Sequence, residues 1–315
     1  TKTGPPLPAI RKGRPGLGSV HSQVLQNVAV RMDLAYKAFF RRVKSGTGGG
    51  DKPGYPGFRG RGRYDSMCYP QAPSGCKLVG NTLHLSKVGP VKALLHRPVE
   101  GTPKTVCIRR SRTGKWYATL SCDWQPSPLP FAFPLPTSTE QVGIDVGLHT
   151  FATLSSGETI ENPRFFRLEE KALAKASRLL SRQEKGTPER ARKRRVVARV
   201  HERTAWRRDN FSHQHSHRIV NRYGVIVVEA LQVREMLANT AGHRLAKSIS
   251  DAAWAGFRSM LTYKAEWAGR KYSAINPAYT TQTCSACGYR LAAEQRLNLS
   301  DRVFVCPSCA LQIDR

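Results

Sequence analysis

Residues 141–148 read QVGIDVGL, and residues 150–154 read TFATL. Two short apolar stretches on either side of a turn are typical of the strands of a β-hairpin. Asp145 stands in the first stretch between Gly143 and Gly147, where a buried carboxylate without a partner would cost several kcal/mol. The position therefore requires a cation or a network of hydrogen-bond donors.

A second carboxylate stands in an equivalent place. Glu229 ends the apolar run of residues 224–228, which predicts a buried strand. Two carboxylates at the ends of adjacent strands suit Mg²⁺, because hard cations prefer oxygen ligands and a pair of ions can flank a phosphate. The pattern equally allows each acid to cap a turn or to pair with an arginine.

Two C-x-x-C pairs, separated by eighteen residues, occur near the C-terminus: Cys284, Cys287, Cys306 and Cys309. This spacing fits a zinc ribbon with four thiolate ligands. Such a site is closed, so we expect Zn²⁺ to serve folding and nucleic-acid contact rather than catalysis. The other four cysteines are scattered: Cys68, Cys76, Cys107 and Cys122. We predict that these four are buried for structural reasons.

The charge of the chain indicates a polyanionic partner. It has 51 lysines and arginines against 22 aspartates and glutamates, and 51 − 22 gives +29 over 315 residues. Such an excess repels itself unless nucleic acid or another polyanion neutralises it. No apolar run reaches the roughly 18 residues that would span a bilayer. The start of the chain lacks the pattern of a secretory signal, so we predict a cytoplasmic protein or a piece of one.

Two segments are predicted to contact nucleic acid. Residues 51–65 mix basic and aromatic side chains among glycines and prolines, which suits a phosphate backbone and its bases. Residues 164–218 are helical in pattern and strongly basic. The candidate contacts in the two segments are Arg59, Arg61, Arg63, Tyr64, Arg192, Lys193, Arg194, Arg195, Arg207 and Arg208. A solvated basic surface is the alternative interpretation of both segments.

The first half of the chain has three kinds of pattern. Residues 1–18, rich in Pro, Gly and Arg, are predicted to be extended. Residues 22–40 carry an apolar stripe at helical spacing, which predicts a helix packed on a core. Residues 66–133 contain short alternating stretches that predict a small antiparallel β-barrel or sandwich.

A proline-rich linker, residues 126–136, separates this half from the next. Beyond it we predict helical structure over residues 165–222, a strand over residues 223–228 and a helix over about residues 247–269.

Several blocks resemble one known family. Residues 276–288, NPAYTTQTCSACG, resemble the signature of the TnpB/OrfB proteins of insertion sequences, and residues 143–147, GIDVG, resemble their first RuvC strand. Further similar blocks are SQVLQ at 22–26, YDS at 64–66, LHRP at 95–98 and YKAEW at 263–267. The blocks come in the family's order, so the resemblance covers nearly the whole chain.

The resemblance implies an α/β multidomain protein. Its expected parts are a partial helical recognition segment (1–65), a β-barrel wedge domain with linker (66–137), an RNase H-like RuvC nuclease domain (138–275), and a zinc ribbon with the start of the last RuvC motif (276–315).

The resemblance also implies an RNA-guided DNA endonuclease of an insertion sequence, related to type V CRISPR effectors. Its expected partners are a guide RNA from the transposon end and double-stranded target DNA bearing a short flanking motif. By position, Asp145 is the first catalytic carboxylate and Glu229 the second, around two Mg²⁺ ions. Tyr279 and Gln282, within the signature block, are expected to contact nucleic acid.

The third carboxylate departs from the family pattern. After the last knuckle the family continues Asp-Arg-Asp-x-Asn, whereas this sequence stops at Asp314-Arg315. We expect the third ligand to follow Arg315, although Asp314 could substitute for it. The alternative functions are a nuclease-inactive, RNA-guided DNA-binding regulator and a transposase that joins DNA ends without RNA.

Overall fold

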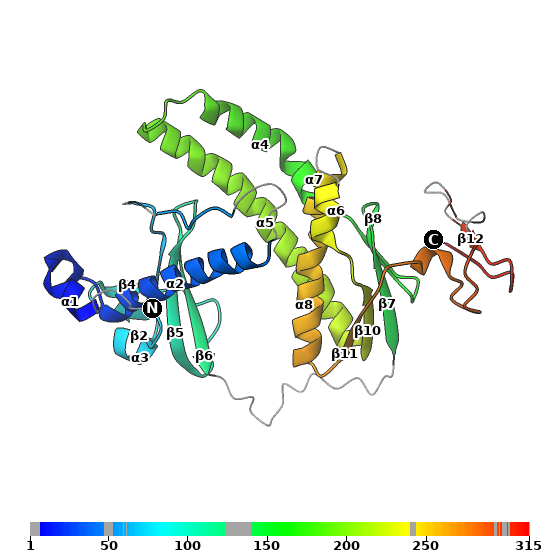
Figure 1. Ribbon diagram of the computed structural model, residues 1–315, viewed down its shortest axis with the longest axis horizontal. Helices are drawn as coiled ribbons and strands as arrows, with labels where there is room; N and C mark the ends of the chain where they lie inside the picture. The colour runs from blue at the N-terminus through cyan, green and yellow to red at the C-terminus, as the bar shows by residue number, and fades with distance from the viewer. Residues whose placement is uncertain are drawn as a thin grey trace. The chain divides into compact units, whose positions relative to one another are not determined.

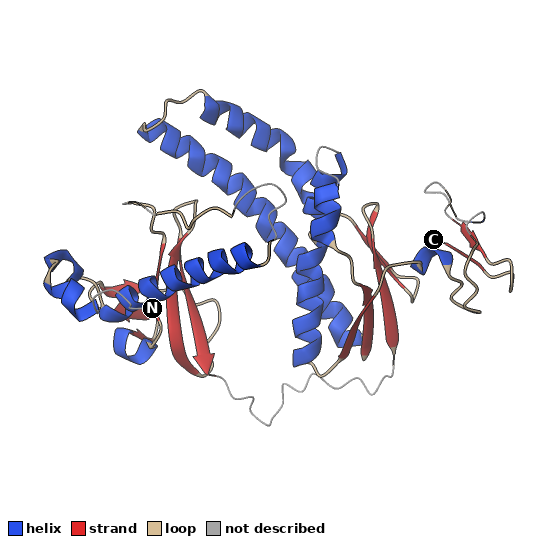
Figure 2. Cartoon of the chain, viewed as in Figure 1, coloured by secondary structure: helices blue, strands red, loops and turns tan. Residues whose placement is uncertain are grey.

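The computed structural model describes residues 7–46, 53–58, 60, 62–123, 140–239, 244–292, 295, 297, 301 and 303–314. The chain divides into two compact units, Thr1–Pro128 with Arg194–Ala198, and Leu129–Lys193 with Arg199–Arg315 (Figures 1 and 2). The predicted linker lies outside the described residues. No helix within the described ranges has the length and apolar character needed to cross a membrane.

The first unit combines helices with two small sheets. Its helical segments are α1 (Leu7–Lys12), η1 (Pro15–Leu17), α2 (Ser22–Lys44) and α3 (Ala72–Gly75). Its strands are β1 (Ser66–Tyr69), β2 (Cys76–Val79), β3 (Thr82–Leu85), β4 (Gly89–Lys92), β5 (Thr102–Arg110) and β6 (Trp116–Asp123). The strands form two antiparallel sheets, in the orders β1-β5-β6 and β2-β3-β4.

One core joins the two sheets of the first unit. Tyr69, Val106 and Ile108 come from the first sheet, and Leu83 and Leu85 come from the second. The short antiparallel strands agree with the sequence pattern. They form two separate sheets that share a core, rather than a single closed barrel sheet.

The N-terminal residues differ from the prediction. Residues 7–12 are helical rather than extended, and the Arg11 guanidinium donates hydrogen bonds to the carbonyls of Gly18 (3.2 Å) and Val20 (3.4 Å). α2 begins at the predicted position. Its described side chains are buried only at Gln23 and Phe39, so its packing is confined to two places along the helix.

Two of the four scattered cysteines form a disulfide that the sequence did not indicate. Cys68 on β1 and Cys107 on β5 are register partners, and the two form a disulfide. Register between distant strands cannot be read from the spacing of cysteines along the chain. Cys68 and Cys76 are buried as predicted, whereas Cys107 and Cys122 are only half-buried.

The second unit is built on a five-stranded mixed sheet. Its strands are β7 (Gln141–Val146), β8 (Thr150–Leu154), β9 (Thr159–Glu161), β10 (Val225–Glu229) and β11 (Lys271–Ile275), with β12 (Val303–Val305) and β13 (Gln312–Asp314) in a separate hairpin. Its helices are α4 (Phe165–Ser181), α5 (Pro188–Arg222), α6 (Val233–Asn239), α7 (Arg244–Ala252) and α8 (Trp254–Trp267), with η2 (Thr280–Gln282). The sheet order is β11-β10-β7-β8-β9, and β10 runs parallel to both of its neighbours. The predicted hairpin of β7 and β8 is confirmed.

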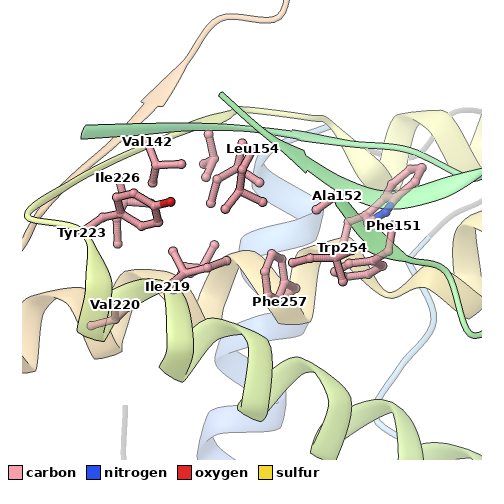
Figure 3. Packing of buried hydrophobic residues seen from close by; sticks show 14 of the residues in the cluster. Val142, Phe151, Ala152, Leu154, Ile219, Val220, Tyr223, Ile226, Trp254 and Phe257 are labelled. Atoms are coloured by element: carbon pink, nitrogen blue, oxygen red, sulfur yellow. The ribbon is translucent and has the colours of Figure 1, made fainter. Parts of the chain in front are cut away.

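Two helices cover one face of this sheet. Figure 3 shows Ile219 of α5 and Phe257 of α8 packed below Val142 and Ile226 of the sheet. Burial of large apolar side chains contributes about 1.5–3 kcal/mol each, so this core dominates the stability of the second unit. The sheet is therefore a rigid support for the residues at its strand ends.

The predicted helical regions are each broken once. Residues 165–222 form two helices because Gly186 adopts a positive φ of 95° and Thr187 caps the second helix, accepting a hydrogen bond from Arg190 N. The predicted helix at about residues 247–269 is interrupted at Ala253, whose φ is 55°. These breaks depend on single residues, to which a periodicity argument is insensitive.

Candidate functional site

Asp145 and Glu229 lie side by side at the carboxyl ends of β7 and β10. The two strands are parallel and pair Ile144 with Val228, so the next residue on each strand is one of the acids. Ile144 and Val228 belong to the buried core. Because side chains alternate between faces, Asp145 and Glu229 project from the opposite face of the sheet.

The environment of the acids favours a cation. The side chain of Asp145 is exposed rather than buried as predicted, because it points away from the core. Neighbouring protein atoms still remove part of its hydration, which raises its pKa although the Val146 amide lowers it. Desolvation also raises the pKa of the half-buried Glu229. The hydrogen bond from Thr280 lowers this pKa, whereas the negative charge of Asp145 raises it further.

No described lysine or arginine forms a salt bridge with either carboxylate, so the alternative of arginine pairing has no support. Two repelling carboxylates without a basic partner fit a divalent cation, which would relieve both charges.

Glu229 also contacts a residue from outside the sheet. The Thr280 hydroxyl Oγ1 lies 2.9 Å from Glu229 Oε1 and 3.1 Å from the carbonyl oxygen of Pro277. Thr280 opens η2, between β11 and the first cysteine knuckle. Sequence reasoning did not single it out, since a lone threonine carries no chemical signal until its contact is known.

The two glycines beside Asp145 have different roles. A Cβ on Gly147 would lie 2.9 Å from the backbone oxygen of Thr150, closer than side chains normally approach. A Cβ on Gly143 would meet Ser155 Cβ at 3.7 Å, which is ordinary contact. Only Gly147 is therefore required by the tight turn that follows Asp145.

The four knuckle cysteines form a compact cluster. Their sulfur atoms lie within 4.8 Å of one another, and the pairs Cys284–Cys309 and Cys287–Cys306 are each 3.6 Å apart. Tetrahedral zinc with Zn–S bonds of about 2.3 Å separates its sulfurs by about 3.8 Å, so the cluster fits the ion.

The electrostatics of the cluster also favour a cation. Backbone donation from Cys287, with further help from Ala286, lowers the pKa of Cys284 to about 6. For Cys309 the Leu311 amide lowers the pKa, but the neighbouring thiols raise it to about 12. Four sulfurs at this spacing cannot all carry charge without a metal ion among them.

The third predicted ligand is not placed by the structure. Asp314 ends β13, where its backbone pairs with Val303 in the ribbon hairpin. Its side chain lies outside the described set. Among the described side chains, the four cysteines are the only group of three or more potential metal ligands.

The predicted basic residues of α5 divide into two groups. Arg207 lies 2.9 Å from Glu169, and Arg208 lies 3.2 Å from Asp251. Both acids are buried, at 7% and 8% exposed, and a buried charge needs a partner. Arg207 and Arg208 therefore join α5 to α4 and α7.

The second group is near the start of α5. Arg192, Arg194 and Arg195 are exposed, and Lys193 is half-buried. The contact of Arg192 with Glu189, at 3.9 Å between two exposed side chains, contributes little. These four cations remain the better candidates for phosphate contact on this helix.

The other predicted nucleic-acid residues are partly described. Arg59 and Arg61 lie outside the described residues, while Arg63 and Tyr64 are exposed. Tyr279 is 49% exposed, and the Arg290 guanidinium lies 3.2 Å from the centre of its ring. The half-buried Gln282 has a side-chain oxygen that accepts no hydrogen bond from the described residues.

Comparison with known families gives two matches. Residues 122–240 match OrfB_IS605, described as a probable transposase, and residues 254–315 match the Cas12f1-like TNB domain.

Comparison with individual proteins gives similar results. The chain is 35% identical over 303 residues to a "Putative RNA-guided DNA endonuclease" of Streptomyces pristinaespiralis, covering 95% of this chain and 70% of the relative. It is 32% identical to "Putative RNA-guided DNA endonuclease InsQ" of Escherichia coli K12, covering 89% and 68%. A cryo-EM structure of a CRISPR-Cas12f ternary complex is 18% identical with a TM-score of 0.40, covering 67% of this chain and 43% of that one. The chain thus spans less than half of the solved protein.

Proposed function

Because the chain belongs to the TnpB/OrfB family of insertion-sequence proteins, we propose that it is an RNA-guided DNA endonuclease that cleaves at a metal-dependent RuvC site. The observation that carries the proposal is the pair of carboxylates on adjacent parallel strands, Asp145 and Glu229. The names of the relatives support a guide RNA and target DNA as partners. A protein with these partners would act in the bacterial cytoplasm.

We further propose how the parts of the chain divide this work. Residues 138–275 would form the RNase H-like nuclease domain, and residues 276–315 the zinc ribbon with the start of the last catalytic motif. Residues 1–65 would belong to a recognition segment, and residues 66–137 to the wedge domain and linker. Within this sequence, Asp314 is the candidate for the third carboxylate.

The geometry supports a hydrolytic mechanism without a covalent intermediate. Asp145 and Glu229 would hold Mg²⁺ through their oxygens at the solvent-facing side of the sheet. When bound, such ions stabilise charge on a phosphate and make water a better nucleophile at neutral pH. The protein itself supplies fixed positions for the two carboxylates, which the packed strands β7 and β10 hold in register.

Binding of the guide and target is assigned to the basic surface. Arg192, Arg194 and Arg195 are exposed near the start of α5 and would contact the phosphate backbone, while base pairing with the guide reads the sequence. The presence of both Asp145 and Glu229 argues against a nuclease-inactive regulator, which would not need the catalytic carboxylates. A transposase would act on DNA ends without any RNA.

The first experiment asks whether RNA is present and needed. The protein is purified from cells that carry its own insertion-sequence end, bound RNA is sequenced, and cleavage of a matching DNA is measured before and after RNase treatment. Guided cleavage that RNase abolishes is expected. Cleavage or strand transfer that survives complete RNA removal would favour the transposase.

The second experiment tests the carboxylate pair with a matched control. Asp145→Asn keeps the shape of the side chain but removes its charge, and losing several kcal/mol of metal-assisted stabilisation lowers cleavage by at least about 1,000-fold. Guided DNA binding should persist. Glu161→Gln, on the edge strand β9 of the same sheet, should cleave at the wild-type rate. Wild-type cleavage by Asp145→Asn would remove that residue from the active site.

A further inference from the structure

Thr280 lies where the cysteine ribbon and the carboxylate pair meet. Its hydroxyl is 2.9 Å from Glu229 Oε1, and four residues later the chain reaches Cys284. We propose that Thr280 is a positioning residue that orients the Glu229 carboxylate for metal binding, and that the folded ribbon holds Thr280 in place. The inference rests on the proposed nuclease function and adds a residue that links its two metal sites.

The hydrogen-bond chemistry favours this role. A threonine hydroxyl has one proton, and here it faces two acceptors, Glu229 Oε1 and the carbonyl of Pro277. Hydrogen bonds to an ionised carboxylate are the stronger kind, so the Thr280 hydroxyl donates preferentially to the ionised Glu229. The bond engages Oε1 and leaves Oε2 free of it. A long side chain with several rotamers is thereby held in one orientation before a cation arrives.

The loop that carries Thr280 is fixed from the ribbon side. The carbonyl of Tyr279 accepts two hydrogen bonds, from the Thr283 hydroxyl at 3.0 Å and from the backbone N–H of Gln282 at 2.9 Å. The amide of Leu291 donates to the carbonyl of Gln282 at 2.9 Å. The turn beginning at Tyr279 is therefore tied to the segment that follows the first cysteine knuckle.

Tyr279 adds a conformational constraint. Its φ of 68° lies in the left-handed region, which a bulky side chain seldom adopts without support from its surroundings. The Arg290 guanidinium lies over its ring at 3.2 Å, and Arg290 pairs with Thr283 in an isolated bridge. Arg290, within the ribbon, thus supports the backbone that aims Thr280 at Glu229.

The test compares three substitutions at neighbouring positions in the full chain. Thr280→Val keeps the shape but removes the donor, Thr280→Ser keeps the donor, and Thr281→Val changes an exposed threonine next to it. Binding of Mn²⁺ to the protein without nucleic acid is measured by electron paramagnetic resonance, with Glu229→Gln as the reference for loss of the site. Cleavage by the guide-loaded protein is measured over a range of Mg²⁺ concentrations.

Thr280→Val should weaken Mn²⁺ binding and raise the half-saturating Mg²⁺ concentration by about 10-fold, as is usual for loss of a residue that orients a metal ligand. Saturating Mg²⁺ should restore the rate. The metal affinity of Thr280→Ser should stay within about twofold of wild type, because serine keeps the hydroxyl that donates to Glu229. Thr281→Val should match wild type, and all three should keep their zinc.

Unchanged metal affinity in Thr280→Val, or the same weakening in Thr281→Val, would overturn the proposal. Loss of zinc or of thermal stability in Thr280→Val would also overturn it, because the residue would then be structural. Arg290→Ala leaves Thr280 intact and should also weaken Mn²⁺ binding. An unchanged affinity in this variant would show that the ribbon does not help to position Thr280. If the wild type cleaves no DNA while Mn²⁺ binding follows this pattern, the nuclease proposal fails and the positioning role stands.

Discussion

The ribbon should unfold when its metal is removed, while the five-stranded sheet stays folded. Apart from its cysteines, the described ribbon core has two buried side chains, Leu291 and Phe304, with the half-buried Leu297 and Leu311 packed against them. The two buried side chains contribute about 3–6 kcal/mol together, and the two half-buried leucines add less than a fully buried side chain would. Zinc bound to a four-cysteine site contributes about 10–16 kcal/mol, which is the larger amount. Chelation, or Cys306→Ser, therefore removes most of what stabilises the ribbon.

Hydrogen exchange measured by mass spectrometry gives a local readout. In the ribbon, the amide of Cys306 donates to Leu311 O at 2.8 Å, and the amide of Leu291 donates to Gln282 O at 2.9 Å. Peptides that cover these amides should lose protection after chelation, and peptides from β7 and β10 should keep it. Cys122→Ser, which changes an unpaired cysteine outside the ribbon, should behave as wild type. Protected ribbon amides in protein shown by metal analysis to be free of zinc would refute the reasoning.

Three further predictions concern stability. Gly147→Ala should lower the free energy of unfolding by about 1–3 kcal/mol, because its Cβ would lie 2.9 Å from a backbone oxygen. Gly143→Ala should lower it by less, and urea denaturation compares the two variants. In air-oxidised protein, reduction of the Cys68–Cys107 disulfide should destabilise the first unit by up to about 4 kcal/mol, given the separation of 39 residues. The variant with both cysteines changed to serine should have the same Tm with and without reductant. In metal-free protein, Asp145→Asn should raise the Tm at neutral pH. The raised pKa of Asp145 means that its ionised form opposes folding, so the difference should vanish below about pH 4, where the carboxyl is protonated in both states.

The sequence predicts those features that depend on local pattern. Alternation and a turn predict β7 and β8, an apolar run predicts β10, and fixed spacing predicts the cysteine cluster. Each of these signals lies within a few neighbouring residues or in a repeated motif. The adjacency of Asp145 and Glu229 requires in addition that β7 and β10 pair directly and in parallel.

The remaining features depend on contacts between distant segments. Arg207 and Arg208 look like phosphate ligands in sequence, but buried acids on α4 and α7 engage them. The exposure of Asp145 depends on which face of β7 meets the helices. Thr280 becomes relevant only because its loop lies against the end of β10. None of these contacts produces a pattern in the sequence from which it could be predicted.

The two metal sites stand in opposite relation to folding. The cysteines come together only when their ribbon is folded, and the apolar core around them is small. The acids are held by β7 and β10, whose other face is packed against α5 and α8 whether or not a cation is present. Because Asp145 is exposed, folding removes only part of the hydration of its charge. Magnesium should therefore be required for cleavage but not for the fold, whereas zinc should be required for the fold of the ribbon and, through Thr280, for the affinity of the magnesium site.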